Sequence, residues 1–199
     1  MKILNLYAGL GGNRTLWKGH EVHAVELNPD ICKIYQDRFP DDKVFCEDAH
    51  EFLLKHYQDY DFIWASPPCP THSSFRQNIC VRFRGTEAVY PDMKLYQEII
   101  FLKHNAKCKW VVENVKPYYD YLIKPDVVLQ RHPFWSNFKI SDKTFEADKI
   151  RTAQIPQLQE LHGIDLSGYK IKDKRKLLRN CVHKELGEHI LEEAIDDIR

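Results

Sequence analysis

Residues 1–12 of the chain read MKILNLYAGLGG, an apolar run that ends in three glycines. Ile3 to Tyr7 has the apolar side chains of a buried strand, and the glycines that follow break the strand into a turn. We expect a helix after this turn, running through Trp17. A strand, a glycine-rich turn and a helix in this order are typical of the first unit of a nucleotide-binding α/β fold.

The same alternation of short strands and helical segments continues through the first two-thirds of the chain. Strands are predicted at 22–26, 44–46, 61–65, 110–112, 127–129 and 134–140, and helices at 28–38, 50–57 and 93–102. Asn28 is expected to cap the first of these helices, with Pro29 in its first turn. Such alternation predicts parallel β-α-β units, and therefore a doubly wound, mostly parallel sheet of the Rossmann-like α/β class.

The last third of the chain is different. Residues 141–170 are polar and weakly periodic, and residues 170–179 (KIKDKRKLLR) carry six Lys or Arg and one Asp, a local charge of +5. Such a run is more often a solvated face than a phosphate-contacting surface. A final amphipathic helix is expected to pack back on the sheet through one apolar stripe: Leu186, Ile190, Ala194 and Ile198, with Leu191 and Ile195 beside it.

Length and composition limit the function classes. The 199 residues suit a single domain (1–199), and 29 Lys plus Arg balance 29 Asp plus Glu. A nucleic-acid partner therefore has to be held by a local basic patch.

No apolar run is long enough to cross a membrane, and the N-terminus lacks a signal-peptide pattern, so we expect a cytoplasmic protein. The six cysteines form no CxxC pair, which argues against a zinc site.

One acidic side chain ends the second predicted strand, and another follows the third. Glu26 is placed to accept hydrogen bonds from ribose hydroxyls, and Asp48 to accept one from an adenine amine. Each acid alone is more often a solvated loop residue. Together with the glycine turn, at successive strand ends along one sheet edge, they predict an adenosine-containing cofactor.

Two further motifs follow later strands. Ser66-Pro67-Pro68-Cys69-Pro70 surrounds one thiol with three prolines, which stiffen the chain and fix the direction of that thiol. Glu113-Asn114-Val115 directly follows an apolar strand, where burial is expected to raise the pKa of the carboxyl group and make it a proton donor. Each motif alone also fits an ordinary turn.

These motifs, in this order, resemble the cytosine-C5 DNA methyltransferase family. LYAGLGG is similar to the cofactor loop of that family, Pro-Pro-Cys to its nucleophile motif and Glu-Asn-Val to its cytosine-gripping glutamate. Asn180-Cys181-Val182 is similar to the Asn-Ser-Val segment that closes over the cofactor, and Gln130-Arg131 to the arginine motif. The match covers residues 1–140 and roughly 172–199.

The chain departs from the family pattern at several points. A single arginine, Arg131, stands where the arginine motif offers two, Arg179 stands where the family usually has Gly, and His183 where it usually has Pro. The large target-recognition domain is reduced to a connector of about 30 residues, 141–171.

The resemblance implies an S-adenosylmethionine-dependent methyltransferase that yields S-adenosylhomocysteine and needs no metal. Cys69 is then the nucleophile at C6 of cytosine, Glu113 the group that bonds N3 and the amine, and Arg131 a residue that holds the base or lowers the thiol pKa. The cofactor-binding residues implied are Tyr7, Ala8, Gly9, Gly11, Gly12, Glu26, Asp48, Ala49, Pro67 and Asn180. Segment 70–90 is expected to be a mobile loop over the flipped base, with Arg76, Arg82 and Arg84 on phosphates.

Duplex DNA with a flipped cytosine is the expected substrate. A homodimer or a specificity-providing partner is compatible with the small recognition segment, as is a prokaryotic, phage or mobile-element origin. Four alternatives stay open: the same chemistry on transfer RNA, the same chemistry on a free cytosine nucleotide, an NAD(P)-dependent oxidoreductase, and a non-catalytic cofactor-binding relative. The oxidoreductase leaves the Pro-Pro-Cys and Glu-Asn-Val motifs unexplained.

Overall fold

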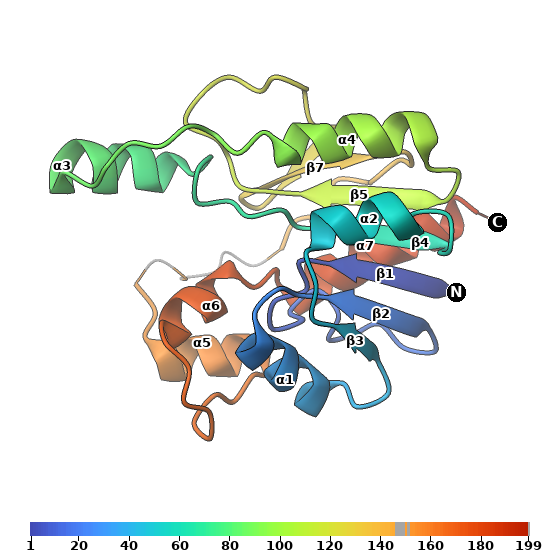
Figure 1. Cartoon of the computed structure of the whole chain (residues 1–199), viewed down its shortest axis with the longest axis horizontal. Coiled ribbons are helices and arrows are strands. Elements are labelled where there is room, and N and C mark those ends of the chain that lie inside the picture. Colours follow the sequence, from blue (N-terminus) through green and yellow to red (C-terminus); the bar gives the residue numbers. More distant parts are fainter. Residues whose placement is uncertain (146–149, 151, 199) are drawn as a thin grey trace.

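A computed structural model describes residues 1–145, 150 and 152–198, which form a seven-stranded sheet (Figure 1). The strands are β1 (Lys2–Leu6), β2 (Glu21–Val25), β3 (Lys43–Phe45), β4 (Phe62–Ala65), β5 (Lys109–Glu113), β6 (Val127–Leu129) and β7 (His132–Ser136). Their order is β3-β2-β1-β4-β5-β7-β6, with β1 to β5 parallel and β7 antiparallel to both of its neighbours. The predicted doubly wound, mostly parallel sheet is confirmed.

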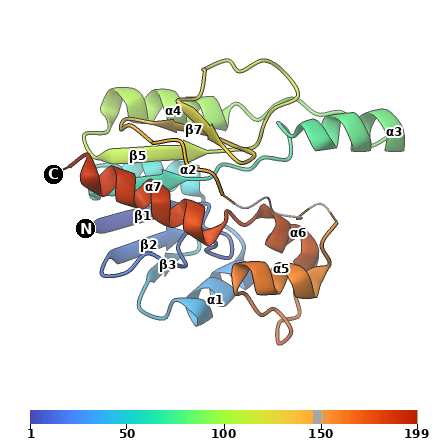
Figure 2. The ribbon, with the colours of Figure 1, turned by 180° about the vertical axis from the view of Figure 1, so that it is seen from behind.

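Helices cover both faces of this sheet, as its strands require because they are apolar on both sides. The regular helices are α1 (Pro29–Arg38), α2 (Ala49–His56), α4 (Lys94–Asn105), α5 (Ile155–His162), α6 (Lys174–Asn180) and α7 (Lys184–Asp196). Helices α2 and α4 lie on one face, and α7 crosses the other (Figures 1 and 2). Helices α5 and α6 pack with α1 in a separate apolar cluster. None of the helices in the described part of the chain is long and apolar enough to cross a membrane.

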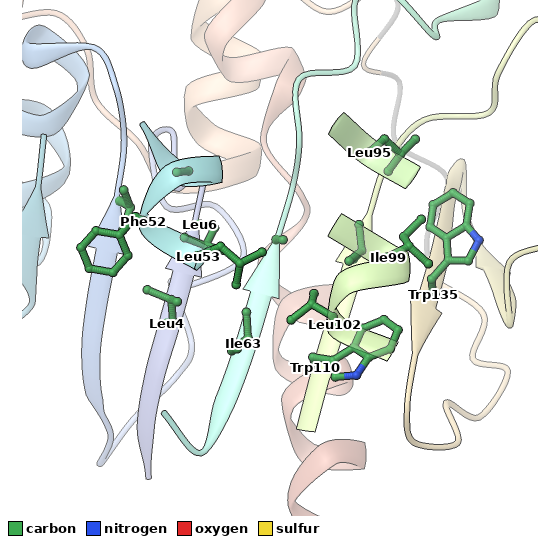
Figure 3. Close-up of a cluster of buried hydrophobic side chains, with 14 of the residues drawn as sticks. Leu4, Leu6, Phe52, Leu53, Ile63, Leu95, Ile99, Leu102, Trp110 and Trp135 are labelled. Atoms are coloured by element: carbon green, nitrogen blue, oxygen red, sulfur yellow. The ribbon is translucent and has the colours of Figure 1, made fainter. Parts of the chain in front are cut away.

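The alternation of side chains along each strand divides the core into two layers. Leu4, Leu6 and Ile63 face helices α2 and α4 and pack with Phe52 and Leu53 (Figure 3). The intervening strand residues face α7 and form the second layer: Ile3, Val22, Phe62, Trp64 and Val111, packed with Leu186 and Ile190. Full burial of each such side chain stabilises the fold by about 1.5–3 kcal/mol. The sheet is therefore a rigid base for the loops at its edge.

The segment after β1 is not the predicted helix but a series of turns. Gly9 and Gly11 have φ values of 53° and 72°, in the left-handed region that a right-handed helix excludes. A Cβ on Gly11 would lie 2.5 Å from the ring of Phe39. Asn13 Nδ2 donates to Asn5 Oδ1 across 2.9 Å, and this side-chain hydrogen bond also competes with helix formation. The first turn is therefore set by close packing and side-chain bonds that a helical period does not reveal.

The segment expected to be a loop, residues 70–90, contains helical structure instead. A π-helical segment η1 (Arg76–Val81) continues into the short α3 (Arg82–Arg84), and together they project from the body (Figures 1 and 2). We call residues 75–90 the arm. No residue of η1 or α3 is buried, so no apolar stripe marks them in the sequence.

Two expectations for the C-terminal third also need correction. The connector 141–171 holds helix α5, whose buried Leu158 packs with Leu178 of α6. Helix α7 packs on the sheet as predicted, but it ends at Asp196. Ile198, expected on its apolar stripe, lies beyond this end and is 53% exposed.

Candidate active site

The carboxyl ends of the parallel strands open into two adjoining cavities. The first, the Cys69 cavity, has a volume of about 340 Å³, and its lining includes Ala8, Gly9, Gly12, Pro67, Cys69, Glu113, Arg131 and Asn180. The second, the Asp48 cavity, has about 630 Å³ and is lined by residues that include Asp48 and Ala49. Tyr7, Glu26 and Pro68 line both. The structure thus brings together twelve of the sixteen site residues chosen from the sequence.

The other four lie elsewhere. Gly11 packs against the rings of Tyr35 and Phe39 and lines neither cavity. Arg76, Arg82 and Arg84 are on the arm, where Arg76 Nη2 donates to the carbonyl oxygen of Glu87 across 3.0 Å.

Glu26 is held at the junction of the two cavities. Its Oε2 accepts from the backbone N–H of Gly9 across 3.1 Å, and its Oε1 from that of Asn28 across 2.9 Å. A carboxylate has about four lone-pair sites, so two such bonds fix its position and leave acceptor capacity for a ligand hydroxyl. The sequence placed Glu26 at a strand end, and the structure shows what orients its side chain.

Asp48 has a structural role in addition to lining its cavity. It caps α2 by accepting from the backbone N–H groups of His50 and Glu51, at 2.8 and 3.2 Å. Its Oδ2 lies 3.6 Å from Lys94 Nζ. Burial by itself raises the pKa of Asp48, but the cap bonds and Lys94 outweigh it, and the pKa lies below its ordinary value.

Cys69 follows the two prolines after β4, is half-buried and lines the cavity. Its carbonyl oxygen accepts from the backbone N–H groups of His72 and Ser73, both at 3.1 Å, so the turn is anchored on its far side. Burial, with a contribution from Glu113, raises the pKa of the thiol to about 11, although Arg131 acts in the opposite direction. The resting thiol is therefore protonated near neutral pH.

Glu113 ends β5 on the same side of the sheet and is buried. Its Oε1 lies 2.5 Å from His132 Nδ1. Burial alone raises the pKa of Glu113, but His132, Ser66 and Arg131 outweigh burial, and the net pKa is below its ordinary value. The expectation of a raised pKa and a proton donor is therefore wrong, because His132 of the neighbouring strand β7 contacts this carboxylate.

Arg131 also lines the Cys69 cavity and is hydrogen-bonded to the same histidine. Its Nε donates to His132 Nε2 across 3.1 Å, and its Nη2 donates to the carbonyl oxygen of Arg179 across 2.9 Å. The guanidinium therefore connects strand β7 to helix α6.

The segment 180–182 forms the part of the cavity wall that is in contact with the glycine turn. A Cβ on Gly12 would lie 2.5 Å from the carbonyl oxygen of Val182, so the two backbones touch here. Asn180, Cys181 and Val182 all line the Cys69 cavity. Sequence elements 168 residues apart thus close one site.

Several lining residues were not predicted as site residues from the sequence: Asn5, His132, Lys176 and Arg179. Lys176 and Arg179 lie in the basic run, whose spacing alone did not indicate which lysines and arginines face a cavity. His132 directly follows Arg131, but nothing in the sequence pairs it with Glu113.

The sheet order, with its antiparallel β7, and the cavities above the glycine turn define a Rossmann-like fold of the S-adenosylmethionine-dependent methyltransferase class. The family model of the C-5 cytosine-specific DNA methylases matches residues 1–120. The chain belongs to this family.

Individual relatives are more distant. A tRNA (cytosine(38)-C(5))-methyltransferase of Spodoptera frugiperda is 33% identical over 76 residues, which cover 34% of this chain and 23% of that protein. The chain thus matches less than a quarter of the length of this curated relative. The Entamoeba histolytica methyltransferase EhMeth superposes over 100% of this chain and 99% of its own, with a TM-score of 0.56 and 9% identity, which is a likeness of fold. Spodoptera frugiperda DNMT2 (E260A/E261A/K263A mutant) gives 26% identity and a TM-score of 0.38 over 58% of this chain and 35% of that one.

Proposed function

We propose that the chain transfers a methyl group from S-adenosylmethionine to C5 of cytosine in DNA, through a transient bond between Cys69 and C6. One observation carries the proposal: a thiol that follows β4 and a carboxylate that ends the neighbouring β5 line a single cavity with the glycine turn, and this cavity adjoins a second one at Asp48. Family membership supports this proposal and disfavours the oxidoreductase alternative.

The residues around the Asp48 cavity fit an adenosine-containing cofactor. A volume of about 630 Å³ is within the usual range for small-molecule sites. Glu26 retains acceptor capacity for ribose hydroxyls, and Asp48 for an adenine amine. The turn at Gly9 and Gly12 lets the backbone approach the remainder of the ligand closely. S-adenosylmethionine supplies an electrophilic methyl group and leaves as S-adenosylhomocysteine.

Cys69 and Glu113 activate the cytosine ring, whose C5 is a poor nucleophile by itself. Cys69 loses its proton to solvent, the sulfur bonds to C6, and the electron pair of the C5–C6 double bond shifts to C5. Arg131 and Lys176 favour the thiolate by their positive charge. As the ring gains electrons, N3 takes up a proton from solvent. Glu113 then accepts one hydrogen bond from the exocyclic amine and one from N3–H. After C5 is methylated, its proton passes to solvent and the C6–S bond breaks, which restores the thiolate. N3 returns its proton to solvent in the same stage, so the product is neutral 5-methylcytosine.

No step of this sequence calls for a metal ion. Within residues 1–145, 150 and 152–198, no group of three or more His, Cys, Asp or Glu side chains is arranged to hold one.

Helix α6 lines the Cys69 cavity and also contacts the start of the arm. Arg179 of α6 lies over the ring of Phe75 at 5.7 Å, where the arm begins. Part of the basic run is structural: Lys174 and Arg175 donate to the carbonyl oxygens of Leu166 and Ala153. Lys176 instead lines the cavity. We infer that Lys176, with Arg82 and Arg84 of the arm, contacts phosphates of the flipped nucleotide's strand.

In this proposal residues 1–199 act as one catalytic domain, with 141–171 as a reduced recognition segment. Target specificity then comes from a partner, a homodimer or a short site. The cytoplasmic location and the prokaryotic or phage origin expected from the sequence stay predictions.

Transfer RNA is the second candidate substrate, because the relative from Spodoptera frugiperda is named for that substrate. The chemistry at Cys69 and Glu113 is the same for both nucleic acids. DNA is placed first because the matching family model is that of the DNA methylases.

The experiment is transfer of tritium from labelled S-adenosylmethionine to duplex DNA, transfer RNA and dCMP or dCTP in parallel. We expect label in DNA with the wild-type chain and none with C69A, while both bind the cofactor equally. C46A removes an exposed thiol and serves as the matched control. Label in RNA or nucleotide would overturn the substrate, and cofactor binding without any label would favour the non-catalytic alternative.

E113Q tests the role of the carboxylate in the same assay. It keeps the shape and can still accept from the exocyclic amine, but it removes the charge that stabilises a protonated N3. We expect kcat to fall far more than cofactor affinity. An equal loss of both would contradict the assigned role.

A further inference from the structure

His132 is a buried residue of the Cys69 cavity for which the proposed chemistry gives no task. It is 4% exposed and begins strand β7, which pairs antiparallel with β5 and places Phe134 opposite Glu113. Its two ring nitrogens contact two site residues: Nδ1 lies 2.5 Å from Glu113 Oε1, and Nε2 lies 3.1 Å from Arg131 Nε. The imidazole therefore bridges the carboxylate and the guanidinium.

The partners of His132 determine its tautomer. Arg131 is permanently protonated and its Nε can only donate, so His132 Nε2 has to present a lone pair. A neutral ring with an acceptor at Nε2 carries its proton on Nδ1, and that proton points to Glu113. The hydrogen-bond chain thus runs in one direction, from Arg131 through His132 to Glu113.

We propose that His132 is a positioning residue of the methyl transfer, which holds Glu113 ionised and in a fixed plane toward the base. The inference rests on the proposed function. The hydrogen bond that His132 donates to Glu113 Oε1 sets the rotation of the carboxylate and favours its charged form. A charged carboxylate in a fixed place strengthens the hydrogen bond from N3 as the sulfur adds to C6, so the gain appears in the transition state.

The position of His132 suits this task better than a purely structural one. A buried histidine needs partners for both ring nitrogens whatever its role, so the identity of those partners separates the two roles. Here both nitrogens contact residues that line the same cavity, and the ring itself lines it. His23, in contrast, is buried on β2 with contacts to Tyr60 and Glu21, and it lines neither cavity of the site.

Two substitutions separate positioning from packing. The side-chain nitrogen of H132N can take the place of Nδ1 and donate to Glu113, whereas H132L fills similar space without a donor. We expect H132L to lower kcat by about 10- to 100-fold, as removal of an orienting partner does elsewhere. H132N should recover most of that loss, and neither change should alter cofactor affinity. H23N and H23L are the matched controls and should leave kcat unchanged.

A readout without substrate tests the tautomer directly. In ¹⁵N NMR spectra of the histidine side chains, we expect His132 to carry its proton on Nδ1 and a lone pair on Nε2. A proton on Nε2, wild-type kcat in H132L, or equal losses in H132L and H132N would each overturn the inference. If the wild-type chain methylates none of the substrates, the proposed function fails. The NMR measurement of the tautomer then still tests whether His132 donates to Glu113.

Discussion

Asn114 donates from its side-chain Nδ2 to the carbonyl oxygen of Pro67 across 2.9 Å, and this hydrogen bond joins the loop after β5 to the loop after β4. Asn114 is 1% exposed, and its Oδ1 also accepts from the backbone N–H of Val115. Asn114 directly follows Glu113, and Pro67 is two residues before Cys69. The bond therefore sets the spacing of the two groups that act on cytosine.

N114A should therefore reduce both stability and turnover. Loss of a buried amide with two partners costs about 1–3 kcal/mol of unfolding free energy, which urea denaturation measures. We expect kcat to fall with little change in cofactor affinity. N137A is the control, because Asn137 joins the opposite end of β5 by bonds to Trp110 and Cys108. If N137A lowers kcat as much as N114A, the loss reflects β5 as a whole and the prediction fails.

The second prediction concerns the reactivity of Cys69. Its pKa of about 11 means that the thiolate fraction rises about tenfold per pH unit up to that value. The rate of alkylation by iodoacetamide at Cys69 should therefore increase steadily between pH 7 and pH 10, measured by mass spectrometry of the labelled peptide. Cys46, which is exposed, provides the internal reference for reagent access.

The same measurement probes the charge on Glu113. The carboxylate contributes to the raised pKa of Cys69, so E113Q should speed alkylation at a fixed pH below 10. A rate at Cys69 that levels off below pH 9 would show that the thiol ionises more easily than its burial implies.

The third prediction is that the arm contributes to nucleic-acid affinity and not to chemistry. Arg82 and Arg84 are exposed on α3, next to the exposed ring of Phe83. Removal of one arginine that neutralises a phosphate should reduce the slope of log K against log salt by about 0.9 for duplex DNA, so R82A/R84A should reduce it by about 2. K103A, on the exposed side of α4, is the control. An unchanged salt slope with R82A/R84A would place the phosphates elsewhere.

The sequence predicted the fold and the lining of the site well, because both depend on strand ends. Glu26, Asp48 and Cys69 each follow a strand and Glu113 ends one, and the carboxyl ends of parallel strands meet at one edge. The strands themselves are marked by buried apolar runs. The cap of α1 by Asn28, which accepts from Asp30 and Ile31, was equally local and was confirmed.

The failures have one physical cause, which is that the deciding contact is distant in sequence or absent. His132 changes the pKa of Glu113 from the neighbouring strand β7, 19 residues further along the chain, and no local pattern records it. The turn after β1 is set by Phe39, a residue of another segment. The arm has no buried side chain and thus no period to detect.

The fourth prediction concerns the contact between the glycine turn and the segment after α6. G12A would bring a Cβ to 2.5 Å from Val182 O and 2.9 Å from Cys181 Cβ, so one backbone has to move. Overpacking of this kind costs about 1–3 kcal/mol, and here it also distorts the wall of the Cys69 cavity. Thermal unfolding should show a lower Tm, and calorimetry a weaker affinity for S-adenosylmethionine. G168A is the matched control, because a Cβ there meets nothing within 4 Å. If G12A binds the cofactor as tightly as G168A does, Gly12 is needed for packing only and the cofactor lies away from this turn.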